Sequence, residues 1–497
     1  MEHESRLLAS IDEVIKAEPD VVIIGSGPAG VAVAEHLYEE DSELKVAVIE
    51  RGSILALTHF NNLFTLDKRG PFIDRFCEHP WEGDMRAGML LPAIGGRGIA
   101  AGAHLRRFDS IDFNLWPDGV WPRVVVAALE KWYPVAEARR RVYKGDPQGS
   151  AQDWAKEKLG RFSPGFPPLG VDFTDIGRFH IGRGFDSSAV RLWHLLLRDH
   201  LEAAPRRLWV VPNTHAIRFT WDDSFISTLE CIHENFENPR IPITARAFVL
   251  AASPIESARI ILNSGLDRDV PAAGRYLADH VWCRAKMIVK ARGFDNEGIN
   301  LIITPQGDDR GDRSSRFQVH LRGEKNDGVM TVDVGGFAAM DPSPGNAVAL
   351  SGTRDRFNVP KAQTRLQPSP DDHCRVDRMC DRILEVAELL NAEKFITDQF
   401  PQDAFKPQYV KGNRIHKMPP GQSYHEAGTL RMGENLSTSA TDSQGKFHSI
   451  DNLFIADASL FPSVGIANPM LTVTALGYHV ADFLVQTRNT REISISV

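Results

Sequence analysis

The first strand-turn-helix unit of the chain, residues 21–52, limits its possible folds more than any other stretch. The apolar run Val21–Ile24 leads into the turn Gly25-Ser26-Gly27-Pro28-Ala29-Gly30, and after a helical pattern a second apolar strand ends at Glu50. This order is the fingerprint of a Rossmann-like dinucleotide-binding unit. The glycines let a pyrophosphate approach the helix N-terminus, and Glu50 can bind ribose hydroxyls. The sequence therefore predicts an α/β fold that binds NAD or FAD.

Length and charge narrow the class of protein. The 497 residues suffice for one large or two ordinary domains, and the net charge of −8 argues against nucleic acid or anionic lipid as a partner. No stretch approaches the roughly 18 uninterrupted apolar residues that a membrane span needs. The acidic N-terminal segment lacks the pattern of a secretory signal, and the five cysteines are scattered like reduced core thiols. We expect a cytoplasmic protein without a metal site, nucleic-acid partner or membrane contact.

Strand and helix patterns divide the chain into three parts. A discontinuous dinucleotide-binding domain is expected over residues 1–281, with irregular excursions at about 53–95 and 145–185. An antiparallel substrate domain backed by helices follows over 282–424, which makes the fold class mixed α/β and α+β. Residues 425–497 are expected to return to the first domain with a catalytic loop and a helix.

Finer patterns place individual strands. Residues 208–211, 216–220 and 225–232 are predicted to form a small antiparallel set. The strands of the substrate domain are predicted at residues 285–290, 298–303, 317–321, 330–337 and 347–351. After these strands, a helix starting at Ser369-Pro370 has its apolar residues on one face, which favours packing on that sheet.

A second glycine cluster, Gly95-Gly96-Arg97-Gly98, runs into small residues at 99–104. Small side chains over about ten positions let a backbone lie flat against a planar ligand. A tight helix–helix contact would use the same composition. Near the C-terminus, the loop 424–433 carries His425 and two glycines. Asn468-Pro469 is a helix start, because Asn is a good N-cap and Pro fits the first helical position. These two C-terminal stretches are predicted to form one wall of an active site.

In combination, H-x-x-G-T-x-x-M-G from His425, N-P-x-L-T from Asn468 and the glycine clusters make the chain resemble the glucose-methanol-choline (GMC) oxidoreductases. These are FAD-dependent alcohol oxidases and dehydrogenases. The resemblance covers nearly the whole length, including residues 251–265 and 274–280, and the Arg431-Met432-Gly433 form is similar to pyranose 2-oxidases and bacterial C-glycoside 3-oxidases. The Glu50-Arg51-Gly52 ending of the second strand likewise resembles the FAD-binding members of the superfamily.

The resemblance implies roles for particular residues. His425 matches the general base that takes the hydroxyl proton while hydride passes to flavin N5, and Asn468 matches a partner position that is His or Asn in relatives. For Asn468 the alternative is a plain N-cap. Ala100 stands where sugar 2-oxidases attach FAD through histidine, so non-covalent FAD is expected. Ala101 stands where many relatives have asparagine beside the flavin. Asp457 is expected to fix the ribityl or pyrophosphate region, with a strand-end turn as the alternative.

The expected cofactor contacts form one set along the chain. They are Gly25, Ser26, Gly27, Ala29, Gly30, Glu50, Arg51, Gly96, Arg97, Gly98, Ala101, Gly102, Ala103, Ala216, Asp457, Asn468, Pro469 and Met470. His104, His280 and His448 are expected to be structural or to lie beside the cofactor.

The implied function is FAD-dependent oxidation of a secondary hydroxyl of a sugar or glycoside, at C2 or C3 of a glucosyl unit, to a ketone. Oxygen or a quinone-like dye is the expected electron acceptor, and a homo-oligomer is one possible state of the protein. The alternative is oxidation of a non-sugar alcohol, whether primary, aromatic or sterol. An NAD-linked flavin or disulfide reductase would need a second G-x-G-x-x-G unit and a redox cysteine pair, and the sequence has neither.

Overall fold

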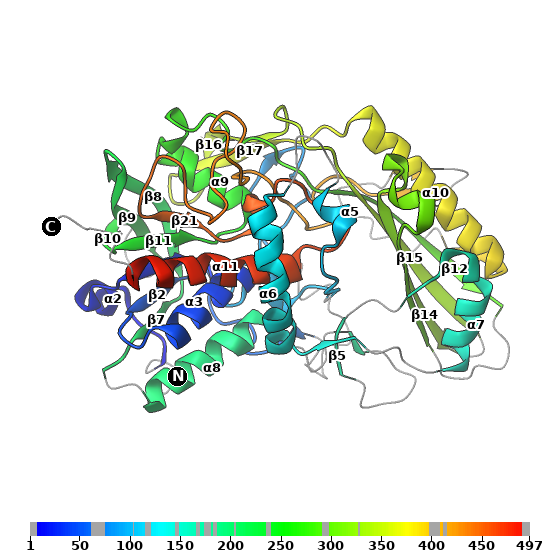
Figure 1. The fold of residues 1–497 in the computed structure, drawn as a ribbon, viewed down its shortest axis with the longest axis horizontal. Coiled ribbons are helices and arrows are strands. Elements are labelled where there is room, and N and C mark those ends of the chain that lie inside the picture. Colours follow the sequence, from blue (N-terminus) through cyan, green and yellow to red (C-terminus); the bar gives the residue numbers. More distant parts are fainter. Residues whose placement is uncertain are drawn as a thin grey trace.

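Two sheets at opposite ends of the molecule organise the fold (Figure 1). The computed structural model describes residues 7–60, 75–102, 104–114, 121–144, 149–165, 169–172, 180–181, 186–202, 205–234, 240–290, 298–326, 329–396, 408–410 and 415–489. The mixed α/β architecture with one parallel sheet and separate antiparallel sheets confirms the predicted fold class. The boundaries near residues 281 and 424 remain our proposal for where the domains divide.

The parallel sheet joins segments from both ends of the chain. Its strands run in the order β21-β11-β1-β2-β7. They are β1 (Val21–Ile24), β2 (Val46–Ile49), β7 (Leu208–Val211), β11 (Ala247–Leu250) and β21 (Leu453–Ile455). Each is an unbroken buried run, as expected for parallel strands covered on both faces. The discontinuity predicted for the nucleotide-binding part is thereby confirmed.

The prediction that residues 208–211 belong to a small antiparallel set was wrong. β7 pairs with β2 in parallel register, because its side chains are buried on both faces. The rest of that prediction is confirmed, since β8 (Thr214–Asp222), β9 (Phe225–His233) and β10 (Ile241–Ile243) form a separate antiparallel sheet.

Helices from distant parts of the chain cover the parallel sheet. α3 (Pro28–Glu40) follows the fingerprint turn, and α11 (Met470–Asn489) lies along it (Figure 1). The two helices approach so closely that a Cβ at Gly477 would stand 2.7 Å from the carbonyl oxygen of Ala29. Among the described residues, this part also contains the helices α2 (Ile11–Ala17), α5 (Ser110–Phe113), α6 (Arg123–Arg140), α8 (Ser188–Glu202) and α9 (Pro254–Asn263).

The excursion expected at residues 145–185 is more regular than predicted. It contains helix α7 (Ser150–Lys158) and two short strands, β5 (Leu169–Asp172) and β6 (His180–Ile181), of which β5 also pairs with β4 (Val142–Tyr143). The helix is held because Gln152 accepts a hydrogen bond from the Asn300 backbone amide and donates one to the Asn300 carbonyl. Of the two predicted excursions, residues 61–74, 145–148, 166–168, 173–179 and 182–185 lie outside the described residues.

The larger antiparallel sheet has the strand order β13-β14-β15-β12-β20-β19, with β18 also paired to β12. Its strands are β12 (His280–Val289), β13 (Gly298–Ile303), β14 (Phe317–Asn326), β15 (Val329–Ala339), β18 (Ala392–Phe395), β19 (Gln408–Val410) and β20 (Ile415–Lys417). Its apolar face packs against α10 (Pro370–Leu389), as the helix pattern predicted. The opposite face carries polar and aromatic side chains and reaches the candidate site.

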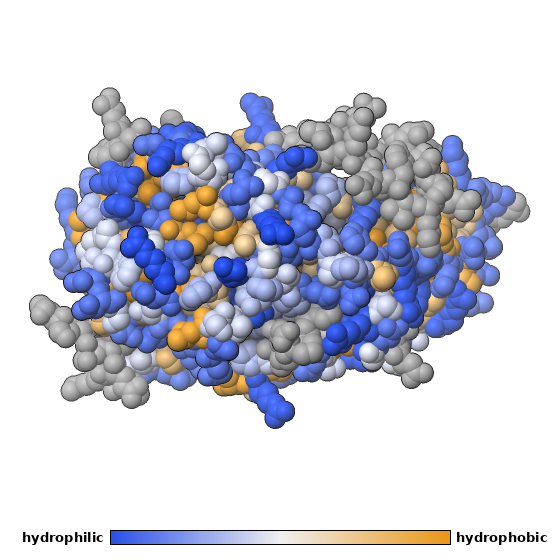
Figure 2. Space-filling view, turned by 90° about the horizontal axis from the view of Figure 1, so that it is seen from above, coloured by the Kyte–Doolittle hydropathy of each residue, from blue (hydrophilic) through white to orange (hydrophobic). Residues whose placement is uncertain are grey.

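Residues 347–351 were also expected in this sheet, and that prediction was wrong. β16 (Ala347–Arg354) pairs with β17 (Pro360–Arg365), which in turn pairs with β3 (Glu82–Gly83). The strand buries Val348 but exposes most of its other side chains, so it suits a small surface sheet. The face shown in Figure 2 is mostly hydrophilic, with apolar side chains in small groups. In the part of the chain that the structure describes, none of the helices combines the length and apolar character needed to span a bilayer.

Candidate active site

A cavity of about 890 Å³ extends from the fingerprint turn to the loop of His425. Most of the residues predicted to contact the cofactor line it: Gly25, Ser26, Gly27, Ala29, Glu50, Arg51, Gly96, Arg97, Gly98, Ala101, Gly102, Ala216, Asp457, Asn468, Pro469 and Met470. Gly30 lies beneath the turn, and Ala103 lies outside the described residues. The predicted positions therefore gather around one cavity, and their contacts with a cofactor stay predictions.

The fingerprint turn shows which glycines are required by packing and which leaves space. Gly25 has φ +102°, and a Cβ there would stand 2.4 Å from the Ala251 carbonyl oxygen. A Cβ at Gly30 would stand 2.0 Å from the Gly25 carbonyl oxygen, so side chains are excluded at both positions. A Cβ at Gly27, in contrast, would meet no atom within 4 Å. Gly27 thus leaves the backbone open on the cavity side, where a phosphate can approach.

Glu50 is held by hydrogen bonds at the end of β2. Its carboxylate is buried and accepts from the Ser26 amide (3.0 Å), the Ser26 hydroxyl (2.6 Å) and the Gly52 amide (2.8 Å). Burial raises the pKa of Glu50. A carboxylate has about four acceptor positions, so one remains for a ribose hydroxyl.

The second glycine cluster packs directly on the fingerprint turn, within the 3₁₀ turn η2 (Gly96–Ile99) and the residue before it. The Gly95 amide donates to the Ser26 hydroxyl at 3.0 Å, and a Cβ at Gly96 would lie 3.3 Å from the Gly27 Cα. A Cβ at Gly98 would stand 2.3 Å from the Ser188 hydroxyl at the start of α8. The small residues therefore serve both uses that the sequence left open, a close contact with a helix and an unobstructed cavity wall.

His425 and His280 form a hydrogen-bonded pair at the other end of the cavity. Their Nδ1 atoms are 2.8 Å apart, and His280 Nε2 lies 3.0 Å from the Gly465 carbonyl oxygen. A carbonyl only accepts, so His280 must carry its proton on Nε2. Neutral His280 then accepts on Nδ1, and His425 must donate its Nδ1–H. This assignment leaves Nε2 of His425 unprotonated, with a lone pair that can accept a hydrogen bond or take a proton.

Asn468 stands at that lone pair. Its Nδ2 lies 3.2 Å from His425 Nε2, and its Oδ1 accepts from Gln318 Nε2 at 3.0 Å. The directions of both bonds agree with the tautomer assigned to His425. The predicted partnership of Asn468 with His425 is thus visible as a contact. The side-chain hydrogen bonds of Asn468 go to His425 and Gln318, which differs from the alternative of a plain N-cap, and α11 begins two residues later, at Met470.

Burial sets the protonation state of the pair. It lowers the pKa of His425 well below the ordinary value, and the neighbouring His280, Arg97 and His104 lower it further. Burial also lowers the pKa of His280 to about 4. Both rings are therefore neutral near pH 7, as a general base requires before it acts.

Two buried aspartates position the elements that carry these groups. Asp279 accepts from the backbone amides of His280 (2.8 Å), Gly421 (3.0 Å) and His425 (3.2 Å), and burial raises its pKa to about 7. Asp112 accepts from the amides of Ile466 (2.6 Å) and Ala467, directly before Asn468. Sequence reasoning assigned neither aspartate a role.

A cluster of buried polar atoms lies beside the pair. The rings of His104 and His320 have centroids 4.3 Å apart. Among the described residues, both ring nitrogens of His320, Nδ1 of His104 and Oε1 of Gln318 have no hydrogen-bond partner. Phe337 closes the other side, with its ring centroid 5.4 Å from that of His425. The histidine pair is thus surrounded by an aromatic ring and by buried polar atoms without partners, and of these neighbours His104 lines the cavity.

Other residues singled out in the sequence have local roles. Asp457 is buried and lines the cavity, and it also accepts from the Ser459 amide (2.9 Å) and the Ser257 hydroxyl (2.5 Å), so the strand-end turn is present as well. His448 contacts the Ser439 hydroxyl at 3.1 Å and is not among the residues lining the cavity. Within the described ranges, no group of three or more His, Cys, Asp or Glu side chains is placed to hold a metal ion.

Comparison with known proteins gives the following matches. Residues 342–477 match the family model described as GMC oxidoreductase, and residues 20–86 match one described as Lycopene cyclase protein. A 2-methyl-1,2-propanediol dehydrogenase from Mycolicibacterium austroafricanum is 24% identical over 94% of this chain and 95% of its own. A C-glycoside 3-oxidase from Microbacterium trichothecenolyticum is 25% identical over 94% and 98%. The crystal structure of pyridoxine 4-oxidase from Mesorbium loti matches with a TM-score of 0.66 at 16% identity, over 94% of this chain and 99% of that one.

The cavity fits the cofactor of this family. The open side of Gly27 and the remaining acceptor position of Glu50 suit a pyrophosphate and a ribose, and Ala100, Ala101 and Gly102 give a wall of small residues for a planar ring. The family model covers the segment with His425 and Asn468, and the relatives align over nearly the full chain. Residues 342–477 thus match the GMC oxidoreductases, and the chain is an oxidoreductase with FAD as its cofactor.

Proposed function

We propose that the chain oxidises a secondary hydroxyl of a sugar or glycoside, at C2 or C3 of a glucosyl unit, to a ketone, with His425 as the general base. The observation that carries the proposal is the chain of hydrogen bonds from the Gly465 carbonyl through His280 and His425 to Asn468. It supports a histidine that is neutral, oriented and aimed with its Nε2 lone pair at the cavity.

The proton step follows from these contacts. A substrate hydroxyl placed between Asn468 and His425 would replace their direct contact, donating to His425 Nε2 and accepting from the Asn468 amide. As His425 takes the proton, its Nδ1–H keeps donating to His280, which stabilises the imidazolium in a buried setting. Bound FAD supplies the acceptor for the hydride that leaves the carbon.

Unused polar atoms favour a substrate with several hydroxyls. A buried donor or acceptor without a partner costs about 1–3 kcal/mol, and a bound hydroxyl can recover that cost. His320, His104 and Gln318 hold such atoms beside His425, and of the three His104 lines the cavity. The relative named C-glycoside 3-oxidase agrees with this choice.

A non-sugar alcohol is the second candidate. Phe337 packs against His425, and Trp282 stacks on Phe337 with ring centroids 5.6 Å apart and planes 8° from parallel. Aromatic rings this close to the base suit an apolar or aromatic alcohol. One solved structure of similar fold is named pyridoxine 4-oxidase, and one relative is named a 2-methyl-1,2-propanediol dehydrogenase, so the assay must include such compounds.

We further propose non-covalent FAD, because Ala100 on the cavity wall offers no attachment atom. Oxygen or a quinone-like dye is our proposal for the electron acceptor, and the cytoplasm for the location, since the described cysteines are free thiols.

The deciding experiment is anaerobic titration of the purified yellow holoprotein. D-glucose, a C-glucoside, pyridoxine and 2-methyl-1,2-propanediol are added in turn while the flavin band near about 450 nm is followed. We expect bleaching by a sugar or glycoside and its loss in His425→Ala. The matched control is His448→Ala, which removes a histidine outside the cavity lining and should bleach like the wild type.

Bleaching by pyridoxine or the diol alone would reject the sugar assignment and support the second candidate. Bleaching that survives in His425→Ala would reject His425 as the base. Product analysis then locates the carbonyl, since oxidation at C2 and at C3 gives different ketones.

A further inference from the structure

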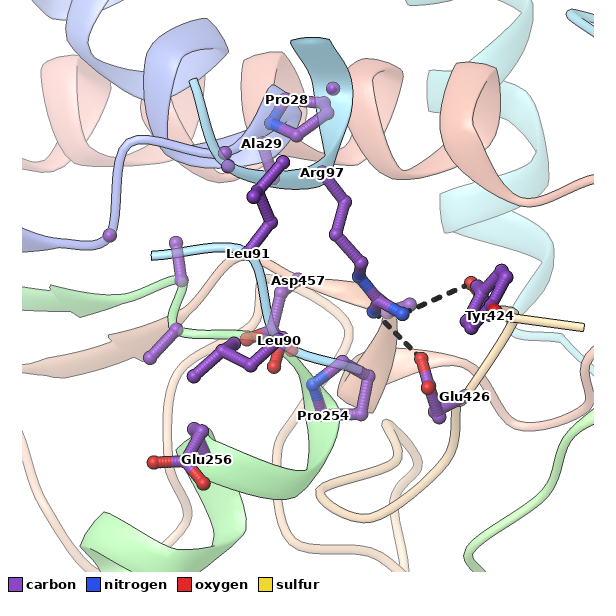
Figure 3. Close-up of a pocket in the computed structure, with 18 of the residues that line it drawn as sticks. Pro28, Ala29, Leu90, Leu91, Arg97, Pro254, Glu256, Tyr424, Glu426 and Asp457 are labelled. Atoms are coloured by element: carbon purple, nitrogen blue, oxygen red, sulfur yellow. Dashed lines mark hydrogen bonds and ion pairs between the residues drawn. The ribbon is translucent and has the colours of Figure 1, made fainter. Parts of the chain in front are cut away.

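We propose that Arg97 is a positioning residue for His425, acting through the Glu426 carboxylate and the Tyr424 carbonyl. The inference rests on the proposed role of His425 as base. Sequence reasoning assigned Arg97 to the cofactor, and the cavity lining does include it. Its guanidinium, however, points at the catalytic loop (Figure 3).

Arg97 contacts the two residues that precede and follow His425 in the sequence. Its Nη2 forms an ion pair with Glu426 Oε2 at 2.7 Å, and its Nη1 donates to the Tyr424 carbonyl at 3.4 Å. The residues before and after His425 are therefore tied to one planar group. A guanidinium can hold two acceptors in fixed directions at once, which a single ammonium cannot do as well.

The ion pair is buried enough to matter. The Glu426 side chain is 1% exposed, and among the described residues its carboxylate has no hydrogen bond that would replace the contact with Arg97. A buried carboxylate without its cation is strongly disfavoured, so loss of Arg97 would move Glu426 and the loop with it.

The loop needs such a hold because its backbone is strained. Tyr424 has φ +61°, a left-handed conformation that is unfavourable for an aromatic residue. Asp279 holds the amide side of the same segment through the His425 N–H at 3.2 Å. Arg97 holds the carbonyl of Tyr424 in the same peptide unit, so the backbone before His425 is fixed by Arg97 on one side and by Asp279 on the other.

Arg97 also joins this loop to the cofactor wall. It belongs to η2, where a Cβ added at Gly96 would lie 3.3 Å from the Gly27 Cα of the fingerprint turn. A single side chain therefore sets the distance between the wall that faces the cofactor and the base. The family motif around His425 does not supply this link, because it comes from a different loop.

A double-mutant cycle tests the proposal. The variants Arg97→Gln, Glu426→Gln and the double variant are compared with the wild-type holoprotein, using the alcohol that bleaches it best. We expect each single variant to lower the rate constant of flavin reduction about 10- to 100-fold, as small misplacements of a catalytic group do. The double variant should be no slower than the slower single one, because both remove the same contact. The affinity for FAD, measured by flavin fluorescence, should change less than about twofold.

The pH profile separates positioning from general damage. The positive charge of Arg97 lowers the pKa of His425, so Arg97→Gln should move the acid limb of kcat/KM to higher pH. Glu426→Gln should not move it upward. The charged and titratable groups packed around His425 are His104, Asp279, His280, His320, Glu426 and Arg97 itself. Arg97→Lys, which restores the charge and the ion pair, should recover part of the rate and the acid limb.

Matched controls use an ion pair of similar length outside the site. Arg218→Gln and Glu230→Gln break the 2.8 Å pair between β8 and β9 and should leave the rate constant and the pH profile unchanged. Hydrogen exchange gives a readout that needs no substrate. The His425 amide should exchange faster in Arg97→Gln than in Arg218→Gln.

Three results would overturn the inference. Additive rate losses in the double variant would show that Arg97 and Glu426 act separately. Weaker FAD binding in Arg97→Gln but not in Glu426→Gln would make Arg97 a cofactor ligand. Unchanged hydrogen exchange at the His425 amide in Arg97→Gln would rule out the positioning role. This test stands even if no tested alcohol reduces the wild type, because that failure would concern the proposed function alone.

Discussion

The hydrogen bond between His280 and His425 gives the sharpest prediction. Phenylalanine at position 280 keeps the ring shape but cannot accept from His425 Nδ1–H or donate to the Gly465 carbonyl. A buried donor left without its acceptor costs about 1–3 kcal/mol. If the loss falls on the transition state, the rate constant of flavin reduction falls about 5- to 150-fold. The neutral His425 ring would also be free to carry its proton on Nε2, where it cannot act as a base.

The assay is stopped-flow reduction of the holoprotein by the best alcohol, in the wild type, His280→Phe and His280→Gln. Glutamine has both an acceptor and a donor, so it should recover part of the rate. Circular dichroism and the FAD stoichiometry check that each variant folds and is loaded. A wild-type rate in fully loaded His280→Phe would refute the reasoning, because the tautomer of His425 would then not depend on His280.

Three further predictions concern the cofactor and stability. Gly30→Ala should purify without flavin, because its Cβ would stand 2.0 Å from the Gly25 carbonyl oxygen. Gly27→Ala should keep the melting temperature of the apoprotein but bind FAD more weakly in a fluorescence titration. Acid precipitation should release all flavin into the supernatant, as Ala100 offers no covalent link, and flavin retained in the pellet would contradict this. The pKa of His280 is about 4 in the fold against 6.5 in a free chain, so the unfolded chain binds more protons between these values. Its contribution to the free energy of unfolding should therefore be complete above pH 6.5 and fall by about 3 kcal/mol as pH drops to 4, as measured by urea unfolding of wild type and His280→Gln at each pH.

Local sequence patterns were enough to predict the nucleotide-binding unit. The turn, α3 and β2 are contiguous, and Gly30 has its contact partner, the Gly25 carbonyl oxygen, within the unit. β7 was misassigned because its neighbour β2 lies far away in the sequence, whereas the strand patterns at 216–232 lie close by. An apolar run predicts that a strand is buried, but it does not predict which strand it pairs with.

The candidate site divides in the same way. His425 and Asn468 were recognisable because each sits in a compact motif. Asp279 and His280 acquire their roles from contacts with His425, 146 and 145 residues later, so the sequence could give only the hint of an Asp-His pair before a buried strand. Gln318 was predicted as part of a strand, and its bond to Asn468, 150 residues away, comes from the face on which that strand places it.

The order of strands in the parallel sheet has a consequence for synthesis on the ribosome. β1 appears first, but β21, the strand beside β11, follows roughly 430 residues after β1, and α11 comes later still. At about 5–20 residues per second, the ribosome needs roughly 20–90 s to complete this sheet. During that time the apolar edge of β11 and one side of α3 stay uncovered, which is the kind of surface that aggregates. Nascent chains that stop before residue 453 should therefore collect in the insoluble fraction, and flavin should be captured only after the last helix has left the ribosome.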